Sequence, residues 1–246
     1  MDKMLYVAMT GAQQAMRAQT AVSHNLANVT TTGFRADLTQ FRAMPVFGPG
    51  MATRVFAMAE RPGVDFAPGA AQTTGRPLDV AVSADGWIAV QSPNGTEGYT
   101  RAGDLRVTSG GLLETGAGHP VLGNGGPIAV PPYDKLEIGA DGTISIKPLG
   151  QSGGTLVQLD RIKLVRPELD RLTKGEDGLM HASDGEELDP DASLRVTSGT
   201  LEGSNVNVVA GLVEMIQLAR RYESQVRMMN VAKEGDESTA QLLRIG

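Results

Sequence analysis

The sequence predicts an α+β fold in which N- and C-terminal helices pair as a coiled-coil-like hairpin and a central all-β domain lies between them. Apolar residues near both ends of the chain recur at alternating steps of four and three, the pattern of a helical heptad. Between Thr74 and Gly199 they alternate with period two, which indicates strands. Glycine contributes 31 of 246 residues and aromatic residues only 4%, which favours many short strands and turns over a large aromatic-lined pocket.

The first helix is expected within residues 1–34, the first part of a discontinuous terminal helical assembly domain. Polar Gln19 and Ser23 occupy two positions of its apolar seam and weaken the centre of the pattern. The seam consists of Leu5, Met9, Ala12, Met16 and Leu26. The residues that flank it are Ala8, Ala15 and Val22, and the small ones would let a partner helix approach closely.

The stretch "SHNLANVTTTGF" (residues 23–34) is where this helix is expected to end, because β-branched threonines and glycine disfavour a helix. Asn25 and Asn28 can hydrogen-bond to backbone groups there, and Phe34 is expected to anchor the exit of the chain. Ordinary capping of a helix end explains these residue types equally well. The residues alone therefore leave two interpretations open, a local cap and a joint used in assembly.

The second helix is expected within residues 204–246, the other part of the helical assembly domain, with Ser204 or Asn205 as its N-cap. Polar Lys233 and Asp236 interrupt its seam near the end. Neither helix has enough apolar width for a globular core, so each needs another helix. The seam consists of Leu212, Met215, Ala219, Tyr222, Val226 and Met229, and Ala240 and Leu243 resume it.

The β-rich domain is expected at residues 74–203. The segment "PLDVAVSADGWIAVQ" alternates, breaks at Asp85–Gly86 and resumes, which is typical of a strand, a turn and a strand. The segments "LRVTSGGLLE", "KLEIGADGTISIKP" and "QLDRIKLV" repeat this format, with turns expected at Gly110–Gly111 and Asp141–Gly142. Residues 35–73 hold several prolines and no sustained period, so they are expected to form an extended connecting segment with one strand around Thr53 to Met58.

Composition excludes several classes of function. The net charge is −6 and the basic residues are scattered, so no nucleic-acid partner is expected. The chain has no cysteine, which excludes disulfides, thiolate catalysis and cysteine-bound zinc. The N-terminal residues lack a basic region followed by an apolar core, so no cleaved signal peptide is expected. No apolar run approaches the length of a membrane span, so direct membrane insertion is not expected.

The motifs that resemble chemical sites lack the required context, so we expect no enzyme and no catalytic, cofactor-binding or metal-binding residues. Residues 150–154 match G-x-S-x-G around Ser152, but the flanking segments are not a strand before and a helix after. The three histidines are not spaced as paired metal ligands, and the acidic run "SDGEELDPD" lacks the EF-hand register. Asn94 begins a glycosylation-like triplet, and "GNGG" (residues 123–126) does not open a helix that could bind phosphate.

Paired terminal helices suggest a subunit of a larger assembly. A seam left uncovered by the partner helix would be a hydrophobic liability in a monomer, and a heterologous interface between copies builds open helical arrays. An alternative is a soluble β-domain binding module with self-capping terminal helices and a binding surface around Trp87 and Tyr99. A third and more distant hypothesis is an exported hydrolase that uses Ser152.

Three long stretches resemble the signatures of the flagellar basal-body rod and hook protein family, in the family's order and over nearly the whole chain. They are "SHNLANVTTTGFRADLTQF", the β segment that begins "PLDVAVSADGWIAVQ" and contains Tyr99 to Gly103 (Y-T-R-x-G), and "LEGSNVNVVAGLVEMIQLARRYESQVRMM". The chain departs from the family pattern at His24, at "ADGWIAV" and after Phe41. These departures, with "GNGGPIAVPP", resemble proximal-rod members more than distal-rod members.

The resemblance implies a structural subunit of the bacterial basal-body rod, the shaft that carries motor torque through the periplasm. It implies partners among other proximal and distal rod proteins, export through the flagellar type III apparatus without a cleaved signal, and no cofactor. It also implies that the terminal helices form the inner layer, which favours the joint over the local cap. The expected assembly interface consists of Leu5, Met9, Ala12, Met16, Leu26, Asn28, Phe34, Leu212, Met215, Ala219, Tyr222, Val226, Met229 and Leu243.

Overall fold

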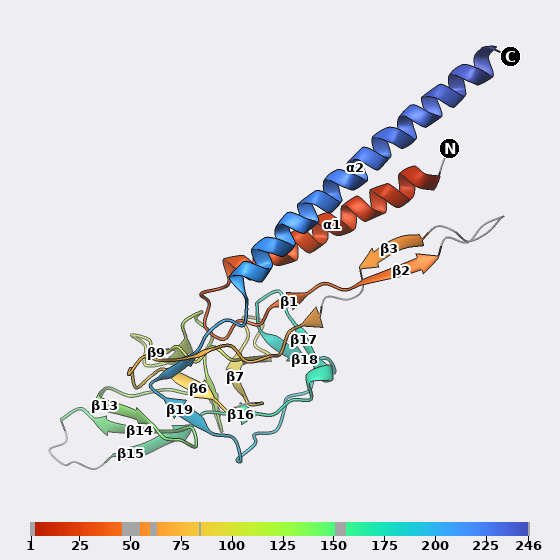
Figure 1. Cartoon of the computed structure of the whole chain (residues 1–246). Helices are drawn as coiled ribbons and strands as arrows, with labels where there is room; N and C mark the ends of the chain where they lie inside the picture. The colour runs from red at the N-terminus through yellow and green to blue at the C-terminus, as the bar shows by residue number, and fades with distance from the viewer. Residues whose placement is uncertain (1–2, 46–54, 60–62, 84, 151–155, 246) are drawn as a thin grey trace. The chain divides into compact units, whose positions relative to one another are not determined.

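The computed structural model describes residues 3–45, 55–59, 63–83, 85–150 and 156–245 (Figure 1). The chain divides into two compact units. The helical unit comprises Met1–Val29, Ala36–Asp65 and Val206–Gly246, and the β unit comprises Thr30–Arg35 and Phe66–Asn205. The segment expected as a connection, 35–73, is therefore shared between the two units. The α+β class predicted from the sequence is confirmed.

The helical unit contains two antiparallel helices, α1 (Lys3–Ala27) and α2 (Val208–Ile245) (Figure 1). The contacts of two glycines show how the two helices are aligned along each other. A Cβ atom on Gly11 would lie 2.9 Å from the Gln225 side chain, and one on Gly211 would lie 3.1 Å from the Leu26 side chain. Each glycine thus accommodates a large side chain of the opposite helix, which allows close packing at both ends of the contact.

The face of α1 that packs on α2 consists of small residues. Ala18 and Val22 form a buried cluster with Leu218, and Leu26 and Met215 pack against it. The buried apolar residues of α1 are Ala8, Ala12, Ala15, Ala18 and Val22. All three residues that the sequence placed on the flank, Ala8, Ala15 and Val22, are therefore buried, and Val22 belongs to the cluster with Leu218. Small side chains on this face let the helix axes approach closely.

Large residues of the expected seam lie outside this contact. Leu5, Met9 and Met16 are 39%, 41% and 56% exposed. On α2 the heptad phase of the buried face is also rotated relative to the expected seam, since Leu218 is buried while Leu212 is exposed. The periodic pattern correctly predicted the two helices, but it gave large apolar residues more weight than small ones in predicting which face is buried.

Short antiparallel strands complete the helical unit. β1 (Asp37–Leu38) pairs with β4 (Gly63–Val64), and β2 (Phe41–Pro45) pairs with β3 (Val55–Ala59). The strand expected around Thr53 to Met58 corresponds to β3, although Thr53 itself lies outside the described residues.

The β unit is an assembly of small antiparallel sheets. Its largest sheet has the order β16-β7-β8-β18-β17, and a second has the order β13-β14-β15. The strands of the largest sheet are β7 (Trp87–Gln91), β8 (Glu97–Thr100), β16 (Leu164–Val165), β17 (Leu172–Lys174) and β18 (Met180–Ala182). Those of the second are β13 (Tyr133–Ile138), β14 (Thr143–Pro148) and β15 (Val157–Arg161). A 3₁₀ turn, η1 (Leu169–Arg171), precedes β17.

The remaining strands form two-stranded ladders: β5 (Ala71–Thr73) with β20 (Thr200–Glu202), β6 (Val80–Val82) with β19 (Val196–Ser198), β9 (Leu105–Val107) with β10 (Leu113–Thr115), and β11 (Leu122–Gly123) with β12 (Gly126–Pro127). The strand–turn–strand segments read from the sequence are thus confirmed. Two of the expected turn glycines, Gly111 and Gly142, have φ of 80° and 84°, a conformation that other residues rarely adopt.

The core of the β unit gathers apolar residues from strands of several of its sheets and from the segments between them. Ile88, Leu105, Leu113 and Ile144 are fully buried in a single cluster. Because strand side chains alternate between faces, each short strand supplies only one or two residues to this cluster. Many short strands therefore share one core, which explains how a chain with few aromatic residues buries enough surface.

We expect Ala18→Leu to separate α1 from α2 and to destabilise their contact by about 1–3 kcal/mol, because Ala18 is fully buried against Leu218 and the added atoms overfill the space. Urea unfolding followed by the helical circular dichroism signal measures the effect. Met16→Leu is the matched control, since Met16 is exposed and the change conserves volume. Equal transitions in the two variants would show that α1 and α2 do not pack closely.

Candidate functional site

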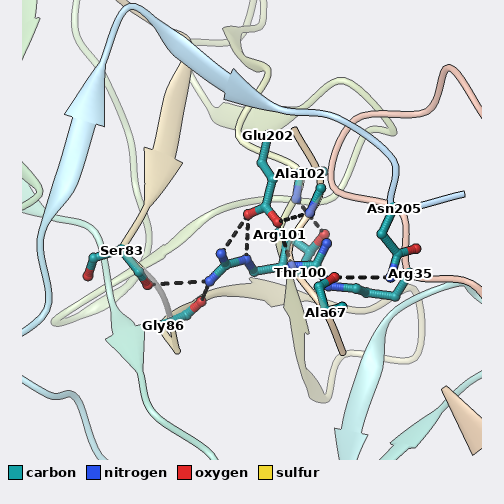
Figure 2. A network of polar contacts seen from close by, with 10 residues as sticks. Arg35, Ala67, Ser83, Gly86, Thr100, Arg101, Ala102, Glu202 and Asn205 are labelled. Atoms are coloured by element: carbon teal, nitrogen blue, oxygen red, sulfur yellow. Dashed lines mark hydrogen bonds and ion pairs between the residues drawn. The ribbon is translucent and has the colours of Figure 1, made fainter. Parts of the chain in front are cut away.

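The most connected polar site of the β unit is an ion network around Glu202, at the end of β20 (Figure 2). Arg35 Nη2 lies 2.6 Å from Glu202 Oε1. Arg101 Nε donates to Glu202 Oε2 at 2.8 Å, and Arg101 Nη2 lies 2.6 Å from the same oxygen. All three side chains are at most 6% exposed. One carboxylate therefore joins two guanidinium groups from distant parts of the chain.

Backbone groups add further hydrogen bonds to this network. The Gly69 N–H donates to Glu202 Oε1 at 2.9 Å. Arg101 Nη1 donates to the carbonyl oxygens of Ser83 and Gly86 on its other side, as Figure 2 shows. The backbone partners of the network thus come from the segment before β5, which holds Gly69, and from the turn between β6 and β7, which holds Ser83 and Gly86.

The aromatic ring of Trp87 lies close to the guanidinium groups of both arginines. The guanidinium carbons of Arg35 and Arg101 each lie 5.9 Å from the centroid of its ring, within the range of a cation–π contact. Phe66 packs edge-on against the same ring, with centroids 6.1 Å apart and planes at 79°. A desolvated cation–π contact adds to the attraction of the carboxylate, which helps to hold two like charges close together.

Electrostatics explains why the network remains charged. Burial acts to raise the pKa of the Glu202 carboxyl, but the charge of Arg101 and the hydrogen bond and charge of Arg35 outweigh burial and hold this pKa below its ordinary value. Burial lowers the pKa of Arg101, and the charge of Glu202 opposes that effect. Glu202 is therefore an anion at neutral pH and stabilises the fold in that form.

Gly33 brings the segment that follows α1 into this network. Its N–H donates to the Glu202 backbone oxygen at 2.8 Å, and its φ is 67°. A Cβ atom at this position would lie 2.3 Å from the Arg101 carbonyl carbon. Only glycine fits both the backbone conformation and the close approach of two chain segments.

Phe34 and its neighbours are held within the β unit. Lys174 Nζ lies 4.2 Å from the centroid of the Phe34 ring and donates to the Arg35 carbonyl oxygen at 3.0 Å. The Asn205 N–H donates to the Phe34 carbonyl oxygen, and Asn205 Nδ2 donates to the Ala67 carbonyl oxygen. Phe34 thus lies at an anchored point of the chain, as the sequence predicts.

A second group of polar contacts lies at the end of α1, in the helical unit. The Asn25 side chain donates to the Asp37 carbonyl oxygen at 2.9 Å and accepts from the Asp37 N–H at 2.8 Å. His24 Nδ1 lies 2.8 Å from Asp37 Oδ2, and Asn28 Nδ2 donates to the His24 carbonyl oxygen. The expectation that Asn25 and Asn28 bond backbone groups is confirmed, and their bonds close the turn that ends the helix.

The other residues expected at the assembly interface differ in their burial within the helical unit. Leu26 and Met215 pack on the cluster between the two helices, and Ala12 is buried. Those with a large exposed fraction are Leu5, Met9, Met16, Leu212 and Tyr222. Ala219, Val226 and Met229 are half-buried on α2, as Asn28 is after α1. Leu243 belongs to α2, but its side chain lies outside the described set.

Side chains that could support catalysis make ordinary structural hydrogen bonds where the structure describes them. Ser92 Oγ donates to Asp177 Oδ2 at 2.8 Å, and His181 Nε2 lies 3.0 Å from the same oxygen, so the carboxylate separates hydroxyl and imidazole. A serine nucleophile would need its hydroxyl on the histidine. Burial acts to raise the pKa of Asp177, but hydrogen bonds led by Ser92 hold it below its ordinary value. Ser152 lies outside the described residues.

Among the residues that the structure describes, no cluster of three or more histidine and acidic side chains is arranged to hold a metal ion. Neither α1 nor α2 is long and apolar enough over its described length to cross a membrane. Trp87 and Tyr99, which the binding-module hypothesis placed on a surface, are 4% and 1% exposed, so that part of the hypothesis is wrong.

Three regions of the chain match known protein families, and each charged residue of the ion network lies in a different one of these regions. Residues 5–35 match the flagellar basal body rod protein family, residues 81–146 match the D1 domain of the flagellar hook proteins FlgE/F/G, and residues 197–242 match the C-terminal region of the flagellar basal body rod FlgEFG proteins. Arg35, Arg101 and Glu202 lie one in each region. The chain is a structural subunit, and it belongs to the flagellar basal-body rod protein family.

Full-length relatives refine this assignment. The chain is 44% identical to the flagellar basal-body rod protein FlgF of Escherichia coli K12 over 99% of both chains, and equally so to FlgF of Salmonella typhimurium LT2. Identity to the rod protein FlgG of Buchnera aphidicola subsp. Schizaphis graminum is 29% over 97% of this chain and 98% of the relative. Within the family the chain is therefore most like FlgF, and it is a structural protein rather than an enzyme.

Family membership also places the chain in the flagellar basal body and implies assembly with other rod and hook proteins. The sequence analysis did not single out Arg35, Arg101 or Glu202. Their signal was present in the "TGFR", "YTRAG" and "LEGSNV" motifs, each of which carries one of the three charges. A charged residue inside each of three widely spaced motifs would have indicated a buried ion network.

We expect Glu202→Gln to lower the free energy of unfolding of the β unit at pH 7 by about 3–5 kcal/mol, because two buried guanidinium groups lose their counter-charge. The folded-state pKa of Glu202 lies below its ordinary value of 4.5, so the carboxylate stabilises the fold above that value, and its contribution is lost as pH falls through the folded pKa. The variant should therefore lose less stability than the parent on acidification.

Urea unfolding followed by the fluorescence of Trp87, the single tryptophan, reports on this network directly. Glu137→Gln is the control, because Glu137 pairs with Lys135 at an exposed site and its loss should change little. Equal effects of the two substitutions would contradict the role assigned to Glu202.

We expect Gly33→Ala to destabilise the β unit more than Gly75→Ala. Both glycines have positive φ, so each substitution costs about 1–2 kcal/mol of backbone strain. Only the Cβ at position 33 meets the backbone of Arg101, whereas nothing lies within 4 Å of a Cβ at position 75. Trp87 fluorescence during urea unfolding measures both variants, and a larger loss in Gly75→Ala would disprove the close approach at Gly33.

Proposed function

We propose that the chain is a subunit of the proximal rod and that the exposed apolar residues of its helical unit contact neighbouring rod subunits. One observation carries the proposal. The two helices of one chain contact each other through alanines, glycines and a few larger residues, and they leave other large apolar side chains exposed. Burying such a side chain is worth about 1.5–3 kcal/mol, so several of them can stabilise an interface strongly.

The exposed apolar residues occur on both helices. On α1 they are Leu5, Tyr6, Met9 and Met16, and on α2 they include Val209, Leu212, Val213 and Ile216. A groove of about 670 Å³ runs along α2, and Val209, Val213, Glu214 and Arg221 are among the residues that line it. Apolar residues beside a groove with charged rims are typical of surfaces that bind another protein.

The proposal extends to the role and location of the subunit. The helices would form the inner, coiled-coil-like layer of the rod and transmit motor torque through their packing. The chain would reach the periplasmic part of the rod through the flagellar type III export apparatus, without a cleaved signal peptide. Membership of the rod family supports these points.

We expect Met16→Asp to prevent incorporation of the chain into basal bodies, because a carboxylate placed on a buried apolar interface loses its hydration without a partner. The variant is expressed in cells that lack the native copy, and swimming and the amount of the chain in isolated basal bodies are measured. Gln13→Asp is the control, since Gln13 is an exposed polar residue of the same helix.

Trp87 fluorescence of the purified variant verifies that the β unit remains folded. Normal swimming and normal incorporation of Met16→Asp would overturn the proposed use of this surface, and so would equal defects in the Gln13→Asp control.

A further inference from the structure

Two Asn-Gly dipeptides occur in the sequence, Asn94–Gly95 and Asn124–Gly125. Both are exposed and both lie in turns of β hairpins, the first between β7 and β8 and the second between β11 and β12. In such a dipeptide the backbone nitrogen of glycine can attack the side-chain carbon of asparagine, because glycine has no Cβ that blocks the approach. The two sites share this chemistry but differ in their hydrogen bonds.

The backbone nitrogen of Gly95 is held in place. Its N–H donates to the Ser92 carbonyl oxygen at 2.9 Å, and the Ser92 N–H donates to the Thr96 carbonyl oxygen across the same loop. Attack by this nitrogen requires the loss of its hydrogen bond and a rearrangement of the loop. The fold therefore protects Asn94.

The backbone nitrogen of Gly125 is not held. Within the described part of the chain, no group accepts a hydrogen bond from its N–H, and nothing lies within 4 Å of a Cβ built on Gly125. The Asn124 side chain is exposed and also makes no hydrogen bond to a described group; only its backbone N–H is engaged, with Asp160 Oδ1 at 3.4 Å. Both reacting groups can thus rearrange without breaking a contact.

We propose that Asn124 is a site of spontaneous deamidation in the folded protein. The Gly125 nitrogen attacks Asn124 Cγ and forms a new C–N bond that closes a succinimide ring. The side-chain nitrogen leaves as ammonia and carries away the proton that the Gly125 nitrogen loses. Water then opens the ring at either carbonyl and leaves aspartate or isoaspartate at position 124, with no change in oxidation state.

The product changes the local charge. Asn124 borders a cavity of about 330 Å³ that is also lined by Glu97, Lys163 and Glu187. Asp160 already lies beside the turn, because a Cβ on Gly123 would be 2.3 Å from its Oδ2 atom. A carboxylate at position 124 therefore adds a negative charge to an acidic edge, and isoaspartate also lengthens the backbone of the turn between β11 and β12.

The test compares the two sites within one molecule. The folded full-length protein is incubated in mildly alkaline buffer, and the mass increase at each asparagine is followed by peptide mass spectrometry. We expect deamidation at Asn124 to be roughly five- to tenfold faster than at Asn94, the ratio that corresponds to one net backbone hydrogen bond. In concentrated urea, where neither turn persists, the two rates should become similar.

Gly125→Ala is the matched variant. Gly125 is not among the glycines with positive φ, and the space around its Cβ position is open, so the substitution fits the native turn. It should slow the reaction at Asn124 while leaving Asn94 and the unfolding monitored by Trp87 fluorescence unchanged. The proposal is overturned if Asn94 reacts as fast as Asn124 in the folded protein, if the difference persists in urea, or if Gly125→Ala leaves the rate at Asn124 unaltered.

Discussion

The β unit depends on the buried carboxylate of Glu202 and on the groups that replace its water. Removing one such ion from water costs several kcal/mol, which is recovered only when its hydrogen bonds and counter-charges are complete. Here the partners are Arg35, Arg101 and the Gly69 N–H, which come from different segments. The carboxylate is therefore stabilised only when all of these segments are in place. A buried network of this kind favours one arrangement of chain segments over others that bury similar apolar area.

The same network explains the constraints at neighbouring positions. Trp87 lies against both guanidinium groups, so its burial serves the interior of the β unit rather than a binding surface. Gly33 bonds the backbone of Glu202 and lies so close to the backbone of Arg101 that no side chain fits at this position. The stretch "SHNLANVTTTGF" therefore makes contacts beyond those of a simple helix cap, and its use as a joint in assembly stays a prediction. Asn25 closes its first part in the helical unit, and Gly33 and Phe34 anchor its last part in the β unit.

Local features of the fold could be predicted from the sequence, whereas long-range pairing could not. Helix and strand periods and the turn glycines Gly111 and Gly142 depend on neighbouring residues, so they are visible in one sequence. The bonds from Glu202 to Arg35 and Arg101 span 167 and 101 residues, and no local period encodes them. The residues of the helix contact were predicted only in part, for another reason. Large residues dominate a periodic pattern, but alanines and glycines determine which helix faces can approach most closely, as Ala18 and Gly11 do.

The backbone bond between Gly33 and Glu202 also has a kinetic consequence. The two helices lie at opposite ends of the sequence, so their encounter in an unfolded chain requires closure of a very long loop. Once the β unit has folded, that bond holds together the two points from which short stretches of chain lead to the end of α1 and the start of α2. A long-range encounter then becomes a local one, at the millimolar effective concentration that short linkers provide. A β unit that is already folded would in this way shorten the search of the two helices for each other.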